Sequence, residues 1–432
     1  INFIKLFNSQ CGNINCNIKN LKIERNNGQD VYLNIFPKYF INDTENNFFP
    51  ISSFKNKKIL GSNENGYFPI ILNDEIGFNN YNHIYKNKKI DILILGDSYA
   101  QGSTHNYNNS IQGILNNNKK LTISFGMGGN GPIISLGSLL EFGEKVNPDK
   151  LVYIFSETND LVYDLFPEAM IHAGKWTDGQ IKVKFFRWIV HLALKRCAMN
   201  VFLGQRLKYY VESIHGNLNN SLIIPVGADS SPFKEFPEIM NPKIKILYCG
   251  NFGNMHDSDT LFEYLKQNPP EGIEFVFHCS GPKRKLLETF RDSQRLTSSR
   301  SKSLGDGLKV ADGLTHKDWV NAMQSAQVAL VTMSAGSEEV VMPSKTYSAM
   351  MAGQAILAIA PEASDLVDLI KQTECGWWVK PGDIDGLRDS INEIRQDSET
   401  LAIRRKNAFK LAHSSFGQDK LAKKWLKLFE SL

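Results

Sequence analysis

Long apolar runs are missing from this sequence. No stretch of about 20 apolar residues occurs, which is the length that a helix needs to cross a bilayer. The first residues, INFIKLFNSQCGN, also lack the apolar core of a signal peptide. None of the six cysteines forms a C-x-x-C pair or a zinc-ligand spacing. We therefore expect a reducing, cytoplasmic location and no bound metal ion.

A strong charge of either sign is missing as well. The 432 residues carry a net charge of +4, without an arginine-rich stripe or an RNA-binding motif. Nucleic acid is therefore not an expected partner. The hydrophobic fraction of 42% is ordinary for a globular protein, and the length predicts two or three domains of about 150 residues each.

Arginine is nearly absent from the first part of the chain. Arg25 alone precedes residue 165 and eleven arginines follow it, whereas asparagine falls from 29 to 11 across the same point. Either two domains differ in their surfaces, or two unrelated segments are joined at about Asn159–Pro167. We favour the second interpretation, because the motifs described below break at the same place. The predicted segments are 1–165, 166–242 and 243–432.

Three apolar runs in the first segment each end in polar residues. The runs Ile90–Leu95, Leu121–Phe125 and Leu151–Phe155 read as strands, with helix-like patterns between them. This alternation predicts a doubly wound, flavodoxin-type α/β sheet, whose chemistry lies at the carboxyl ends of the strands. Those ends read G-D-S-Y-A-Q-G (96–102), G-M-G-G-N-G-P (126–132) and S-E-T-N-D (156–160).

These strand ends resemble the SGNH hydrolase family. The resemblance implies that Ser98 is the nucleophile, while the backbone N–H of Gly128 or Gly129 and the side-chain amide of Asn159 form the oxyanion hole. Such donors must be aimed at the developing oxyanion. An upstream stretch, G-S-N-E-N-G-Y-F-P (61–69), also looks like the leader of bacterial members found near polysaccharide genes.

The SGNH-like segment departs from the family pattern in two ways. Glu157 stands where the third block has glycine, and no aspartate in the sequence is followed three residues later by histidine. The Asp-x-x-His block is therefore missing, and a serine without a base is a weak nucleophile. We expect an incomplete hydrolase site; the alternative is that Ser98 only caps a helix.

The third segment alternates strands and helices in the order of a Rossmann-like domain. The predicted strands are Ile244–Cys249, Ile273–His278, Leu308–Asp312, Gln327–Met333, Ala355–Ala360 and Trp377–Lys380. The first strand ends in a glycine-rich turn at 250–253, and a helix pattern follows. This arrangement brings backbone N–H groups and a helix dipole to one point, which suits a phosphate group.

Four motifs of this part resemble the second domain of glycosyltransferase family 4, which has the GT-B fold of two Rossmann-like domains. They are Y-C-G-N-F-G (248–253), S-G-P-K-R-K (280–285), V-M-P-S-K-T-Y-S-A-M-M-A-G-Q-A-I-L-A (341–358) and G-W-W-V-K-P-G-D (376–383). The resemblance covers residues 166–432, so the segment 166–242 looks like the remnant of the family's first domain and its crossover. It implies a nucleotide-sugar donor, transfer with retention, and neither a metal ion nor another cofactor.

The resemblance also implies a set of nucleotide-sugar-binding residues. They are Gly250, Asn251, Gly253, Lys283, Arg284, Glu338, Glu339, Ser344, Lys345 and Tyr347. Lys345 is the strongest candidate for a phosphate contact, because a lysine at a helix start among small residues readily meets a phosphate. The glutamates could instead form a solvated acidic loop, and Lys283 with Arg284 a solvated basic turn. Ser348 stands where the family usually has a ribose-binding glutamate.

A helix near Trp176–Arg196 is predicted to mix aromatic and basic side chains. Such a helix can lie on an anionic membrane as a peripheral contact at its inner face; we favour the alternative, an interdomain helix with a wet basic face. Next to it, Asn200–Gly204 reads as a strand, and patterning allows it to pair beside Leu151–Phe155. If the two do not pair, residues 1–165 should be loosely packed, which is the outcome we expect.

Three functions follow as hypotheses. The first is a glycosyltransferase that moves a sugar from a nucleotide-sugar to a cell-envelope polysaccharide or lipid-linked acceptor. The second is an SGNH-type esterase or acyltransferase acting on polysaccharide. The third is a catalytically inactive composite that only binds nucleotide. We rank the first highest, because its motifs are long and stand in the right order.

Overall fold

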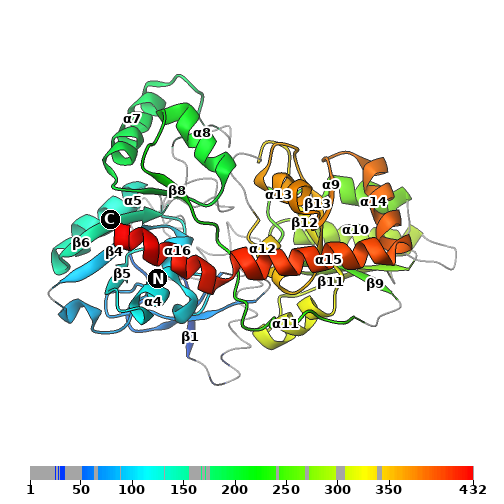
Figure 1. Ribbon diagram of the computed structural model, residues 1–432, viewed down its shortest axis with the longest axis horizontal. Coiled ribbons are helices and arrows are strands. Elements are labelled where there is room, and N and C mark those ends of the chain that lie inside the picture. Colours follow the sequence, from blue (N-terminus) through cyan, green and yellow to red (C-terminus); the bar gives the residue numbers. More distant parts are fainter. Residues whose placement is uncertain are drawn as a thin grey trace. The chain divides into compact units, whose positions relative to one another are not determined.

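The apolar runs of the sequence become parallel strands in the computed structural model of the chain (Figure 1). The structure describes residues 25, 28, 30–34, 51–62, 67–87, 89–130, 132–154, 167, 171, 176–239, 243–267, 272–297, 307–337 and 343–431. The chain divides into two units. The N-terminal unit comprises Ile1–Ser62, Pro69–Pro225 and Ala422–Leu432, and the C-terminal unit comprises Asn63–Phe68 and Val226–Leu421.

The C-terminal unit is built on one six-stranded parallel sheet. Its strands are β9 (Ile244–Asn251), β10 (Ile273–Ser280), β11 (Leu308–Ala311), β12 (Val328–Thr332), β13 (Ala355–Ile359) and β14 (Gly376–Val379). All six strands predicted from the sequence are present, and the α/β class with parallel sheets is confirmed. The strand order β11-β10-β9-β12-β13-β14 is that of a dinucleotide-binding Rossmann sheet.

Helices cover both faces of this sheet, because its strands are apolar on both sides. The helices are α9 (Asp259–Gln267), α10 (Arg284–Thr297), α11 (His316–Gln324), α12 (Lys345–Met351), α13 (Asp365–Thr373), α14 (Ile384–Gln396) and α15 (Ser398–Leu411). A π-helical turn at Ala412–Phe416 then leads into α16 (Gln418–Ser431), which continues into the N-terminal unit. The main core joins one face of the sheet to α9, α10 and α14, with Phe262 stacked on Phe290 at 4.5 Å between ring centroids.

The N-terminal unit contains a second parallel sheet with the order β5-β4-β6-β7-β8. Its strands are β4 (Ile90–Gly96), β5 (Thr122–Ser124), β6 (Pro148–Ile154), β7 (Asn200–Phe202) and β8 (Ser221–Ile223). Ile154 of β6 pairs with Val201 of β7, so strands from both sides of residue 165 share one sheet. This differs from the expectation of separate segments, because the chain next passes into the C-terminal unit only after Pro225.

Short helices and a small sheet complete the N-terminal unit. They are β1 (Val31–Leu33), β2 (Lys58–Leu60), β3 (Ile70–Leu72), α3 (Ser98–Gln101), α4 (Ile111–Asn117), α5 (Pro132–Phe142), α7 (Ile181–Arg196) and α8 (Gln205–His215), with 3-10 turns at Ile84–Lys86, Tyr107–Asn109 and Gly143–Lys145. The small sheet pairs β1 with β2 in parallel and β2 with β3 antiparallel. Within the described ranges, each helix is too short or too polar to cross a membrane.

Candidate functional site

The order of the C-terminal sheet marks one place for a ligand. The strand order reverses between β9 and β12, and ligands of such sheets bind outside the carboxyl ends of the strands at that reversal. The carboxyl ends there are Asn251 and Thr332. Both carry a buried side-chain oxygen, Oδ1 and Oγ1 respectively, that has no hydrogen-bond partner among the described residues. Because buried polar atoms are normally satisfied, these two atoms fit a polar ligand.

Glycine is needed at two positions beside this reversal, near the end of β9 and in the turn after β10. Gly250 has a φ of +125° and Gly281 a φ of +107°, which side chains rarely adopt. A Cβ atom on Gly281 would lie 2.4 Å from Asn251 Oδ1 and 2.6 Å from the carbonyl oxygen of Phe252. Gly253 is different, since a Cβ atom there would meet nothing closer than 3.6 Å. Because Gly253 has no side chain, a ligand can come close to the backbone of this turn.

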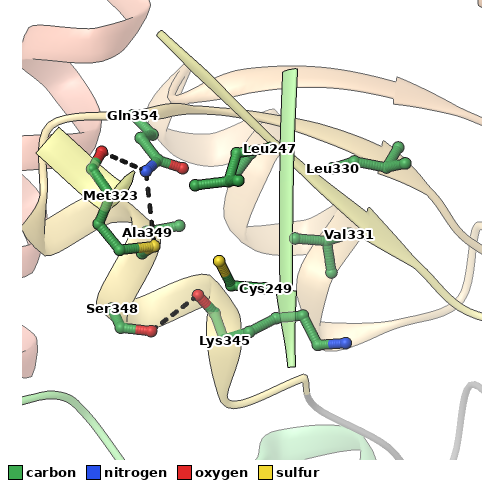
Figure 2. Close-up of a pocket in the computed structure, with 10 residues that line it drawn as sticks. Leu247, Cys249, Met323, Leu330, Val331, Lys345, Ser348, Ala349 and Gln354 are labelled. Carbon is green, nitrogen blue, oxygen red and sulfur yellow. Dashed lines mark hydrogen bonds between the residues drawn. The ribbon is translucent and has the colours of Figure 1, made fainter. Parts of the chain in front are cut away.

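Lys345 reaches the same place from the first turn of α12. Its side chain is 9% exposed, and Nζ donates to Tyr248 Oη at 2.6 Å and to the carbonyl oxygen of Asn251 at 3.5 Å. The ammonium also lies 4.1 Å from the centroid of the Tyr248 ring. Figure 2 shows Nζ pointing away from the small void that α12 makes with the sheet. The side chain of Lys345 thus lies at the carboxyl end of β9, and its contact with a nucleotide-sugar stays a prediction from the sequence.

The void in Figure 2 lies behind Lys345, between α11, α12 and the sheet. Its lining is mostly apolar and consists of Leu247, Cys249, Met323, Ala329, Leu330, Val331, Lys345, Ser348, Ala349 and Gln354. Ser348, which the sequence resemblance aligns with a ribose-binding glutamate, faces this void and donates to the carbonyl oxygen of Lys345 at 3.1 Å. Ser348 thus contributes to helix packing.

His256 is a site residue that the sequence reasoning missed. Its ring is 2% exposed, and Nδ1 lies 2.7 Å from the carbonyl oxygen of Thr332. A carbonyl only accepts, so Nδ1 carries the proton and Nε2 can accept from Lys345 Nζ at 3.4 Å. Burial, and then the charge of Lys345, hold the pKa of His256 well below its usual value; Lys283 acts in the same direction. The His256 ring is therefore neutral and lies close to the positive charges of Lys345 and Lys283.

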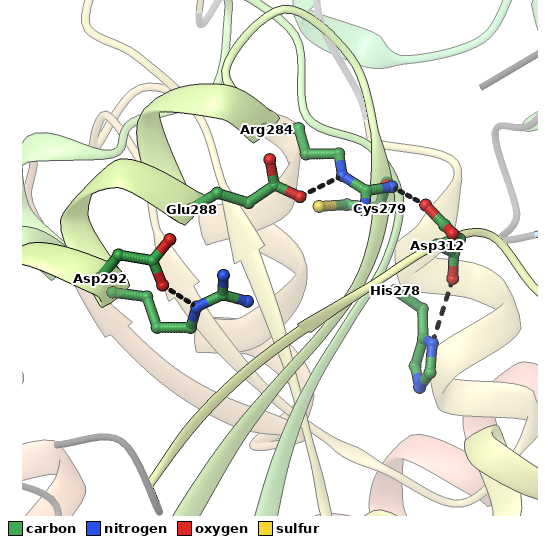
Figure 3. Close-up of polar contacts among 7 residues, drawn as sticks. His278, Cys279, Arg284, Glu288, Asp292 and Asp312 are labelled. Carbon is green, nitrogen blue, oxygen red and sulfur yellow. Dashed lines mark hydrogen bonds and ion pairs between the residues drawn. The ribbon is translucent and has the colours of Figure 1, made fainter. Parts of the chain in front are cut away.

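Two basic residues, Lys283 and Arg284, follow β10 and have different roles. Lys283 Nζ donates to the backbone carbonyl of His256, so this ammonium group belongs to the cluster at the strand ends. Arg284 points elsewhere (Figure 3): it pairs with Asp312 at 2.5 Å and with Glu288 at 2.9 Å. Two carboxylates neutralise the guanidinium, so Arg284 is placed as a structural residue that joins β10, β11 and α10.

Two of the remaining predicted residues, Ser344 and Tyr347, are described by the structure. Ser344 is the N-cap residue of α12, although its side chain makes no capping hydrogen bond. Tyr347 is 3% exposed, and its ring packs 4.8 Å from that of Phe416, which places it in the core. Glu338 and Glu339 lie outside the described residues.

The SGNH-like positions of the N-terminal unit are only partly described. Asp97 is the N-cap of α3, and Ser98, the first residue of that helix, donates to Asp97 Oδ2 at 3.4 Å. The backbone N–H of Gly128 donates to Gln101 Oε1 at 3.0 Å, so this predicted oxyanion donor already has an acceptor. Asn159 lies outside the described residues. The hydrolase assignment stays a prediction from the sequence.

Comparison with known proteins identifies the C-terminal unit. Residues 230–411 match the family model described as glycosyl transferases group 1. The C-terminal unit is a glycosyltransferase group 1 domain. The chain is also 23% identical over 247 residues to the probable glycosyltransferase WbjE of Pseudomonas aeruginosa. That match covers 54% of this chain and 58% of the relative, so the chain spans little more than half the length of that relative.

Solved structures of similar fold extend beyond the glycosyltransferase domain. HepE of Anabaena in complex with UDP matches with a TM-score of 0.56 at 14% identity, covering 79% of this chain and 100% of that one. Sucrose-phosphate synthase of Thermosynechococcus elongatus matches with 0.53 at 15% identity, over 74% and 76%. WaaG, a glycosyltransferase involved in lipopolysaccharide biosynthesis, matches with 0.51 at 13%, over 78% and 98%. The shared fold therefore includes much of the N-terminal unit.

Proposed function

We propose that the chain transfers a sugar from a nucleotide-sugar to a glycan or lipid-linked acceptor. The observation that carries the proposal is the convergence of Lys345 and Lys283 on His256 at the carboxyl ends of β9 and β12. Two ammonium groups beside a glycine-rich turn suit the diphosphate of such a donor, because they would offset the negative charge of the departing nucleoside diphosphate.

The comparisons support a nucleotide-sugar as the donor substrate. Crystal structures of HepE, whose fold resembles this chain, contain UDP or UDP-glucose. We infer that a nucleotide-sugar binds this chain with its diphosphate near Lys345, and the HepE complexes make a uridine nucleotide the first candidate. Assignment to family 4 and transfer with retention follow from the sequence resemblance and belong to the proposal. The cytoplasmic location likewise stays a prediction.

Titration calorimetry of the full chain with UDP and with GDP tests the proposal. We expect saturable binding of at least one nucleotide, and slow release of free sugar from the corresponding nucleotide-sugar. The absence of heat with both nucleotides, for protein that melts cooperatively, would contradict donor binding. Binding without any sugar release or transfer would support the inactive composite instead.

A further inference from the structure

The second strand of the C-terminal sheet ends without a carboxylate. Sheets with this strand order hold the ribose of a dinucleotide with an aspartate or glutamate about 20 residues beyond the glycine-rich turn. Here that turn is followed by β10, which ends in His278, Cys279 and Ser280. Ser348, which the sequence resemblance aligns with a ribose-binding glutamate, faces the void behind Lys345. An acceptor for the ribose hydroxyls of a donor must therefore come from another element.

Asp312 brings a carboxylate to this place from the neighbouring strand. β10 and β11 pair in parallel, with His278 opposite Ala311, so Asp312 comes directly after the last paired residue of β11. The pairing puts it beside the end of β10, although it stands 34 residues after His278 in the sequence. The carboxylate that the strand order calls for is thus present, on the third strand in place of the second.

Two contacts hold Asp312 in place (Figure 3). Its Oδ1 pairs with Arg284 at 2.5 Å, and its carbonyl oxygen accepts from His278 Nδ1 at 3.3 Å. Arg284 is itself fixed, because it donates to the carbonyl oxygen of Cys279 at 2.9 Å and pairs with Glu288 at 2.9 Å. The side chain of Asp312 is nevertheless 37% exposed. A carboxylate has about four acceptor positions, so it can take hydroxyl donors in addition to the ion pair.

We propose that Asp312 accepts hydrogen bonds from the ribose of the donor nucleotide, the 2′-hydroxyl among them. The inference rests on the proposed function, which puts the diphosphate beside Lys345 and Lys283. Lys345 reaches the end of β9 from α12, and Lys283 reaches the same cluster from the turn after β10. A nucleoside that extends past Lys283 arrives at the end of β11, two strand spacings or roughly 10 Å from the end of β9. A carboxylate that is already held in place binds the ribose without a further cost in side-chain entropy.

Titration calorimetry of the full chain with UDP and with 2′-deoxy-UDP tests the proposal. The wild type should bind UDP about tenfold to a hundredfold more tightly, because the deoxy compound loses a hydrogen bond to a charged group. In Asp312→Asn this preference should fall by about fivefold or more, since a neutral amide oxygen is the weaker acceptor. If GDP is the nucleotide that binds, GDP and 2′-deoxy-GDP give the same comparison.

Glu288→Gln is the matched control. Glu288 pairs with the same guanidinium and is 36% exposed, so its replacement removes an equal charge and one partner of Arg284. Its preference for the ribose compound should equal that of the wild type. The proposal is overturned if the wild type binds both nucleotides equally, if Asp312→Asn keeps the full preference, or if Glu288→Gln loses as much of it.

The wild-type comparison needs no variant, and thermal melting verifies that both variants are folded. A wild type that binds neither UDP nor GDP contradicts the proposed function, and this inference with it. Binding of a nucleotide without any preference for ribose contradicts the role of Asp312 alone.

Discussion

Replacement of Lys345 by methionine is the sharpest perturbation of the proposed donor site. Methionine keeps a long unbranched stem in a position that is 9% exposed, so packing changes little. The change removes the ammonium group that lies between Tyr248 Oη and His256 Nε2. A hydrogen bond to a charged group contributes about 1.5–3 kcal/mol. The affinity for UDP or GDP should therefore fall by about tenfold to a hundredfold.

The same variant has a second readout that needs no nucleotide. The charge of Lys345 is one of the causes that lower the pKa of His256, after burial. In Lys345→Met the pKa of His256 should rise, while burial keeps it below the usual value. An NMR titration of the His256 ring measures this shift. Tyr248 still donates to the carbonyl oxygen of Asn251 at 2.7 Å, so the strand end should keep its shape.

Lys371→Met is the matched control for this experiment. Lys371 is a surface lysine of the same unit that pairs with Glu362 at 3.2 Å, and its removal changes the net charge equally. Its affinity for nucleotide should stay within about twofold of the wild type, because exposed pairs contribute little. If Lys345→Met binds UDP and GDP as tightly as the wild type, a phosphate contact by Lys345 is refuted. An equal loss in both variants would instead reveal an effect of net charge.

Three further predictions concern stability. Gly281→Ala should lower the free energy of unfolding by about 1–3 kcal/mol, because of the φ of +107° and the approach to Asn251; an unchanged melting temperature would contradict this. Burial, with His191 and Arg187, lowers the pKa of His215 from 6.5 to about 4. The unfolded chain therefore takes up the proton first, and the stability that His215 contributes above pH 6.5 should be lost towards pH 4, by up to about 3 kcal/mol. Melting curves of His215→Gln should lack that part of the pH dependence. Val201→Asp buries a carboxylate in β7, so it should lower the free energy of unfolding by several kcal/mol and accelerate hydrogen exchange in both β4 and β7. Persistent protection of β4 would show that the strands before and after residue 165 fold separately.

The sequence predicted the C-terminal sheet well because its strands are short apolar runs separated by glycine or by amphipathic helices. Gly250 and Lys345 could be placed for the same reason, since each stands next to a strand or helix end that the pattern defines. Arg284 could not be placed, because its partner Asp312 follows a different strand. His256 was missed because it stands three residues after the glycine-rich turn, and only tertiary structure brings Lys345, Lys283 and Thr332 around it.

The composition changes near residue 165, but the two structural units divide elsewhere. The two features have different physical causes. Asparagine and arginine contents describe mainly surfaces, whereas a sheet is held together by strand pairing and by burial of its faces. Tyr153 of β6 packs against two core clusters, one from the segment before residue 165 and one formed by α7, β7 and α8 after it. Val201 and Phe202 are 2% and 0% exposed, so β7 is an interior strand between β6 and β8. The early strands therefore depend on β7 to cover the edge at β6, and the described strands on both sides of residue 165 belong to one compact unit although the composition changes between them.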